Sequence, residues 1–256
     1  MRNMTNALKQ GLVIGLMGLL GVAGSAQAVL ISVSNGTLSA SADFTVVGGN
    51  LQVVLTNTST SDVLVPADVL TAVFFDLNGV GALTPVSALL TAGSSVSYDP
   101  DGQPAGGVVG GEWAYGAGLV GSPGGSEGLS SSGFGLFGSA NFPGANLAGP
   151  VAVDGPQYGL LSAGDNTGTG NVGGVTGSGG LILNSVTFTL SGLPAGFTTE
   201  DLDITTVAFQ YGTSLFPAEP CIGSCTPTRI PEPSVPLLIG AALLAWGTAR
   251  RFVSRR

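Results

Sequence analysis

Glycine is concentrated in the middle of this chain, where residues 93–180 contain 27 glycines in 88 positions. Glycine raises the entropic cost of folding and provides no side chain to pack, and its spacing here lacks the period of three that collagen requires. Large apolar and aromatic residues, which disordered segments usually lack, recur through the segment: Trp113, Tyr115, Phe134, Leu136, Phe137, Phe142 and Tyr158. We therefore expect long loops and irregular strands laid over a β-domain, with full disorder as the alternative.

The segments on either side have the periodicity of β-strands. Before the glycine-rich part, Val29–Ser34 and Leu51–Thr56 fit short strands, and Val69–Leu77 is a nearly continuous apolar run that fits a buried strand. After it, Leu181–Leu190 alternates, and Leu202–Tyr211 changes phase partway along, as a strand does at a β-bulge. Early and late strands then share one core, which predicts a mainly β fold, an antiparallel β-sandwich with long Gly-rich loops.

The distribution of charge excludes one class of function. No Lys or Arg lies between Val29 and Thr228, no His occurs anywhere, and this interval holds 14 of the 15 acidic residues, a formal charge of −14. Phosphate binding requires Lys or Arg, so nucleic acid is not expected as a partner. The acidic surface suits a hydrated layer or divalent cations, and simple solubility is the plainer explanation.

The first 28 residues have the parts of a secretory signal peptide. A positively charged start precedes an apolar stretch, residues 11–24, and Ala26 and Ala28 form the small-x-small pattern of a cleavage site. We expect signal peptidase to cut after Ala28 and leave Val29 as the new N-terminus. An uncleaved anchor is the alternative, but the apolar stretch is short for a bilayer.

The other end, residues 231–256, holds three features in a fixed order. Pro231, Glu232 and Pro233 come first, an apolar run over residues 235–249 follows, and a basic cluster is last: Arg250, Arg251, Arg255 and Arg256. Fifteen helical residues span roughly 22 Å, less than the roughly 30 Å of a hydrocarbon core. The arginines would hold this short helix at the cytoplasmic face as a stop signal. Leader and tail together predict that residues 29–230 lie outside the cell.

This tail resembles the PEP-CTERM sorting signal, because the Pro-Glu-Pro motif, the short apolar helix and the terminal arginines occur in that order. The resemblance implies that a membrane protease, exosortase, recognises the tail and cuts near the motif. It also implies a Gram-negative bacterium that makes extracellular polysaccharide. The same tail is sometimes labelled an ice-binding-protein C-terminal motif, a label that says nothing about ice. A plain single-pass anchor with a proline-rich stalk is the alternative.

These signals divide the chain into four segments. We expect a signal peptide at 1–28, an exported β-rich domain at 29–215 with the Gly-rich insert 93–180, a linker at 216–230, and the sorting tail 231–256. The linker holds Cys221 and Cys225, and a close pair in an exported chain predicts a disulfide. A zinc site would need further ligands, and no His supplies them.

No pattern in the exported part predicts an enzyme or a cofactor. Residues 124–128, Gly-Gly-Ser-Glu-Gly, match the nucleophile elbow of hydrolases, but that motif requires a base, and neither His nor Lys is present to act as one. Glycosidases need only two carboxylates, so a third-ranked alternative is a glycosidase using carboxylates alone. Its candidate residues are Asp99, Asp101, Glu112 and Glu127, and nothing in their spacing selects a pair.

Two binding functions remain as alternatives. A carbohydrate-binding module would use exposed aromatic side chains such as Trp113 and Tyr115. The other is calcium binding, because Asp99 and Asp101 place oxygen ligands at alternate positions, as a calcium loop does. The run from residue 99, Asp-Pro-Asp-Gly, also favours an ordinary turn. Residues 200–203 form a second acidic cluster.

The sequence as a whole predicts an exported, non-enzymatic surface or extracellular-matrix protein, structural in role and linked to exopolysaccharide or biofilm. Its processing partners would be signal peptidase and exosortase. It would be held in the inner membrane through its tail and then released or attached at the cell surface, with exopolysaccharide as the candidate matrix partner.

Overall fold

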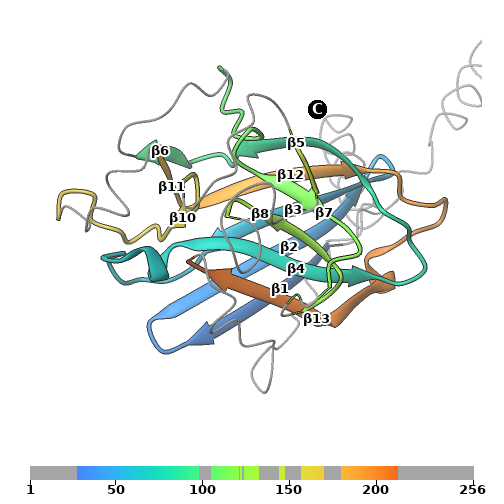
Figure 1. Cartoon of the computed structure of the whole chain (residues 1–256), viewed down its shortest axis with the longest axis horizontal. Helices are drawn as coiled ribbons and strands as arrows, with labels where there is room; N and C mark the ends of the chain where they lie inside the picture. The colour runs from blue at the N-terminus through green and yellow to red at the C-terminus, as the bar shows by residue number, and fades with distance from the viewer. Residues whose placement is uncertain are drawn as a thin grey trace, which may run out of the picture. The chain divides into compact units, whose positions relative to one another are not determined.

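A computed structural model of the chain describes residues 28–97, 105–120, 122, 124–132, 144–147, 157–169 and 180–212. All of these residues belong to one compact unit, which is mainly β and contains two hydrogen-bonded sheets (Figure 1). Two short 3-10 helices interrupt the strands, η2 (Pro66–Asp68) and η4 (Thr199–Asp201). The prediction of a mainly β fold is therefore confirmed for the described part of the chain.

The first sheet has five strands in the order β1-β2-β3-β12-β5, and every pair in it is antiparallel. Its strands are β1 (Ala28–Asn35), β2 (Leu38–Val47), β3 (Asn50–Asn57), β5 (Thr84–Leu90) and β12 (Ser185–Ser191). The first two hairpins turn at Gly36 and Gly48, whose φ angles of 62° and 58° suit residues without a Cβ. Figure 1 shows β1 and β5 at opposite sides of this sheet.

The second sheet has eight strands, ordered β6-β11-β10-β4-β8-β7-β9, with β13 paired to β4. Its strands are β4 (Leu70–Leu77), β6 (Ser95–Ser97), β7 (Ala114–Gly116), β8 (Glu127–Ser130), β9 (Gly144–Asn146), β10 (Leu160–Leu161), β11 (Leu181–Leu183) and β13 (Leu202–Tyr211). β10 and β11 run parallel, so the expectation of purely antiparallel pairing is wrong for this sheet. The predicted bulge in β13 is confirmed, because its register with β4 shifts between Asp203 and Ala208.

The glycine-rich segment is part of the β-structure itself. Its described residues supply β6, β7, β8, β9 and β10, none longer than four residues, so they build much of the second sheet. The expectation of irregular strands holds, but the expectation that they lie over a separate β-domain is wrong. Short strands suit this composition, because each glycine removes a side chain that would stabilise pairing.

Leu181–Leu190, which the sequence predicts as one strand, is two strands in different sheets. β11 belongs to the eight-stranded sheet and β12 to the five-stranded sheet. Asn184 separates them with a φ of 89°, a left-handed conformation that Asn tolerates better than most residues. The chain crosses from one sheet to the other at this residue.

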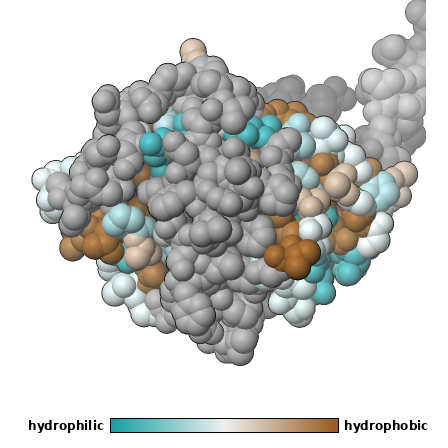
Figure 2. Space-filling model, viewed as in Figure 1, coloured by the Kyte–Doolittle hydropathy of each residue, from teal (hydrophilic) through white to brown (hydrophobic). Residues whose placement is uncertain are grey.

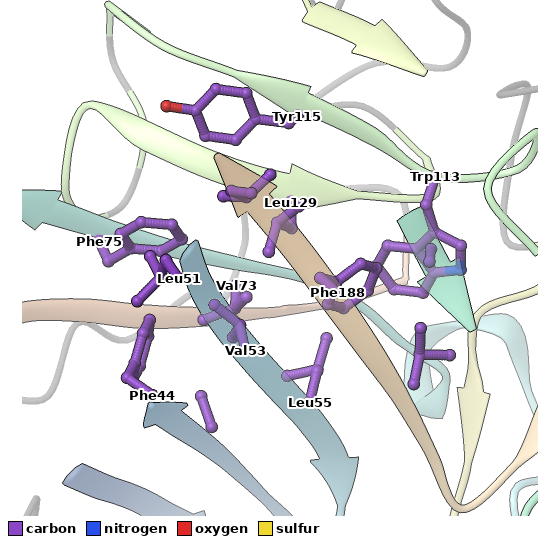
Figure 3. Close-up of a cluster of buried hydrophobic side chains, with 14 of the residues drawn as sticks. Phe44, Leu51, Val53, Leu55, Val73, Phe75, Trp113, Tyr115, Leu129 and Phe188 are labelled. Atoms are coloured by element: carbon purple, nitrogen blue, oxygen red, sulfur yellow. The ribbon is translucent and has the colours of Figure 1, made fainter. Parts of the chain in front are cut away.

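One hydrophobic core contains residues from both sheets (Figure 3). Phe44 of β2 and Phe75 of β4 meet edge to face with ring centroids 5.3 Å apart. The ring centroid of Trp113, just before β7, lies 4.9 Å from that of Phe188 in β12. Each such contact is worth about 0.5–1.5 kcal/mol beyond the burial of the rings, so these pairs help to join the sheets.

The exposed surface of the described residues carries no positive side chain, because Lys, Arg and His are absent from them. Figure 2 shows apolar side chains in several separate groups on the visible face. The large apolar residues that are exposed are Val47, Leu64, Val65, Val86, Leu89 and Val120.

Candidate functional site

A buried carboxyl group on the second sheet is the most unusual polar feature among the described residues. Glu127 begins β8 opposite Phe75 of β4, and its side chain is 5% exposed. The Tyr115 hydroxyl of β7 donates a hydrogen bond of 2.8 Å to Glu127 Oε2 and accepts one of 3.0 Å from the backbone N–H of Leu83. The sheet register fixes this contact, since β7 and β8 are neighbouring antiparallel strands.

Burial is the main influence on the pKa of Glu127. Removal from water raises the pKa of Glu127 to about 7, the hydrogen bond from Tyr115 opposes that rise, and the nearby charge of Asp76 adds to it. Burial also raises the pKa of Tyr115 above its ordinary value. The described residues include no cation that could neutralise an ionised Glu127, so below neutral pH the protonated form predominates.

Residues 124–128, which match the nucleophile elbow in sequence, form a tightly packed connection. Ser126 donates from its backbone N–H and its hydroxyl to Asp76 Oδ1, over 2.6 and 2.8 Å. The N–H of Gly125 donates to the carbonyl of Thr206 over 2.9 Å. A Cβ on Gly125 would overlap the carbonyl of Phe75, and one on Gly124 would overlap that of Thr206. Close approach to β4 and β13 therefore explains both glycines.

The carboxylates proposed for a glycosidase are only partly within the described residues. Glu112 is 1% exposed and Glu127 is 5% exposed, so both lie away from the surface where a polysaccharide would bind. Asp99 and Asp101 lie outside the described residues. Of the four candidates, the structure therefore describes two, and both are buried.

The expectation that Trp113 and Tyr115 are exposed is wrong (Figure 3). Trp113 is fully buried, and its indole N–H donates to the carbonyl of Tyr158 over 3.1 Å. Tyr115 is 3% exposed and holds Glu127. Both aromatic side chains belong to the core, because each satisfies its polar atom there.

The second acidic cluster forms local turns. Asp201 Oδ2 accepts from the N–H and the hydroxyl of Thr198, which caps η4. Asp203 Oδ1 accepts from the N–H and the hydroxyl of Thr205. Within the described ranges no three Asp, Glu, His or Cys side chains are grouped to hold a metal ion. The other calcium candidates, Asp99 and Asp101, lie outside these ranges.

Two further aspartates, which the sequence analysis missed, join distant loops. Asp62 accepts from the N–H of Asn166 and the hydroxyl of Thr169, each over 2.9 Å, and these contacts lower its pKa. Asp165 accepts from the N–H of Val63 over 2.8 Å. The Asp-Asn-Thr-Gly run from residue 165 signals a turn, but nothing local to it indicates its partner.

Most of the residues singled out in the leader, the linker and the tail lie outside the described ranges: Ala26, Cys221, Cys225, Pro231, Glu232, Pro233, Arg250, Arg251, Arg255 and Arg256. The expected tail helix 235–249 lies outside them as well, and among the residues that are described no helix is long and apolar enough to span a membrane. Ala28 is described and begins β1.

No protein-family model matches the chain, and no curated protein or solved structure is significantly similar to it.

Proposed function

We propose that this protein is an exported bacterial surface or extracellular-matrix protein, structural rather than enzymatic, which is processed through a PEP-CTERM-type sorting signal. The observation that carries the proposal is the order of features in residues 231–256: the motif Pro231–Pro233, the apolar run 235–249 and the arginine cluster. The leader-like residues 1–28 support the same topology from the other side of the chain.

The position of β1 supports removal of the leader. β1 begins at Ala28, the residue after which signal peptidase would cut, and Val29 is already buried in the core. Cleavage there removes one of the eight residue pairs between β1 and β2, Ala28 with Thr45, and keeps the other seven. The body of the protein therefore retains its first hairpin after processing.

The chemistry of the body supports a role in a hydrated layer. Every charged side chain of the described residues is a carboxylate, which attracts water and counterions and opposes close packing with nucleic acid. We also propose a β-sandwich as the architecture, with the Phe44–Phe75 and Trp113–Phe188 contacts lying between its two layers.

The test is the intact mass and location of the protein in a Gram-negative host that has exosortase. We expect a species that begins at Val29, ends near Pro233 and is recovered outside the inner membrane. The double substitution Glu232→Ala/Pro233→Ala should block cleavage, so that the protein keeps Arg256 and stays in the inner membrane.

The matched control is Glu219→Ala/Pro220→Ala, since it removes the same dipeptide upstream of the motif. This variant should be processed like the wild type. A wild-type protein that retains Arg256 in the inner membrane would instead be a plain anchored protein, and the sorting proposal would be rejected.

A further inference from the structure

The outer side of β1 is an open sheet edge. β1 ends the strand order of the five-stranded sheet, and among the described residues only β2 pairs with it. Its sequence, AVLISVSN, contains no charged residue, proline or glycine, and its register with β2 is unbroken over eight residues. Such an edge presents a regular row of backbone N–H and C=O groups on which another strand can pair.

The other described edges are protected against such pairing. β5 contains Pro85, and the chain at residues 107–109 lies along it, with hydrogen bonds of 2.9 Å from Leu90 to Gly107 and 3.0 Å from Val109 to Ala88. β6 and β9 have three residues each. β13 changes register twice. Proteins commonly use proline, short strands and bulges to protect their edges, so β1 stands apart from the rest.

The side-chain pattern of β1 is complementary to itself. Val29 and Ile31 are buried in the core, whereas Ser32 and Ser34 are exposed on the other face. A twofold axis perpendicular to the sheet, midway between the two strands and level with Ile31 or Ser32, would set the strand antiparallel to its own copy. Residues of the same parity then lie opposite each other, so inward side chains meet inward ones and the sheet continues into the second copy.

The charge of β1 itself does not oppose this partner. β1 of a second copy brings no acidic side chain to the edge, although the rest of the copy is acidic. The neighbouring strand β2 carries one carboxylate, Asp43, opposite Leu30. In a paired sheet the two Asp43 strands would be three strand spacings apart, about 14 Å. That exceeds the Debye length of about 8 Å at physiological salt, so their repulsion is largely screened.

We infer that the outer edge of β1 is a self-association surface, on which β1 of one copy pairs antiparallel with β1 of a second copy. The inference holds whether or not the tail is sorted, because it rests only on the described sheet. The paired strands bury a small area, so the dimer is weak and depends on concentration and salt.

The experiment measures the dimer by sedimentation velocity on protein expressed from the full-length gene and purified in the form in which the host leaves it. Wild type should show a monomer–dimer equilibrium that strengthens from 50 to about 500 mM NaCl as repulsion is screened. Ser32→Lys and Ser32→Asp should each raise the dimer Kd about fivefold or more, because the two like charges then lie directly or diagonally opposite each other. An equimolar mixture of the two variants should restore the dimer.

The control is Ser87→Lys, on the protected edge strand β5, which should associate like the wild type. Far-UV circular dichroism verifies the fold of each variant. A wild type that stays monomeric up to about 1 mM at high salt overturns the inference. So do Ser32 variants whose dimer Kd equals that of Ser87→Lys.

Discussion

Glu127 shows what burial does to a carboxyl group when no cation is present among the described residues. Its side chain is 5% exposed, and its described hydrogen-bond donor is the neutral hydroxyl of Tyr115. Burial raises its folded-state pKa to about 7 from an ordinary value of 4.5, so folding favours the protonated form. The stabilising contribution is therefore complete below about pH 4.5 and is lost as the pH rises through 7.

We expect the free energy of unfolding to fall between pH 5 and pH 8 and the substitution Glu127→Gln to reduce that fall. Gln keeps the acceptor for Tyr115 but cannot ionise, so the variant should be more stable than wild type at pH 8 by on the order of 2 kcal/mol. Urea unfolding across this pH range is the measurement, and Glu200→Gln controls for the loss of one charge. Equal pH slopes for wild type and Glu127→Gln would contradict the assignment.

At the scale of elements, the connection into β8 packs closely against β4 and β13 because Gly124 and Gly125 have no side chain. Gly125 faces the backbone of Phe75 and Asp76, which cannot move without disturbing the central strand of the second sheet. A backbone neighbour yields far less than a flexible side chain, so the contact is a steric limit.

The substitution Gly125→Ala should therefore lower the free energy of unfolding by about 3 kcal/mol or more, because its Cβ would overlap the carbonyl of Phe75. Gly81→Ala is the matched control, since no atom lies within 4 Å of its Cβ position and its φ is not positive. That variant should be neutral or slightly stabilising. Chemical denaturation of both proteins distinguishes the two sites, and a Gly125→Ala protein as stable as Gly81→Ala would show that the contact is absent.

Elements with a clear period were predictable from the sequence, and elements that depend on distant contacts were not. β1, β3, β4 and the bulged β13 follow their apolar patterns. β2 was missed because small Ala and Ser residues weaken its alternation, although Ala40, Ala42 and Phe44 are all buried. The break at Asn184 was invisible, since the apolar pattern continues across it while the backbone changes sheet.

The candidate site was the hardest part to predict. Glu127 was identified only as one of four acids, and its partner Tyr115 was expected to be exposed. The pairing of β7 with β8 decides both outcomes, and it forms between two short glycine-containing strands that carry almost no local signal. Burial of a polar residue is set by tertiary packing, which the residue's own neighbours in sequence do not reveal.

At the scale of the whole molecule, the dominant electrostatic feature is a large negative charge without compensation. The interval 29–228 carries −14, and self-repulsion of this size destabilises the compact state relative to the expanded chain. Added salt should relieve it, because ions screen the repulsion between exposed charges that are more than a Debye length apart.

We therefore expect the melting temperature at pH 7 to rise as NaCl increases from about 20 to 500 mM. At pH 3, where most carboxylates are protonated, the same salt series should change the melting temperature little. Differential scanning calorimetry at both pH values makes the comparison. A melting temperature independent of salt at pH 7 would show that repulsion contributes little to stability.

The pairing of early strands with late strands delays completion of the fold during synthesis. β3 pairs with β12 and β4 pairs with β13, and the hydrogen bond between Thr71 and Gln210 joins residues 139 positions apart. At about 5–20 residues per second, a ribosome needs roughly 7–28 s to make the chain between them. Throughout that interval β3 lacks β12 and β4 lacks β13, so neither sheet can be completed until the last strands are made. Under the proposed export, this delay leaves both sheets incomplete during the period in which a translocation channel could receive the chain.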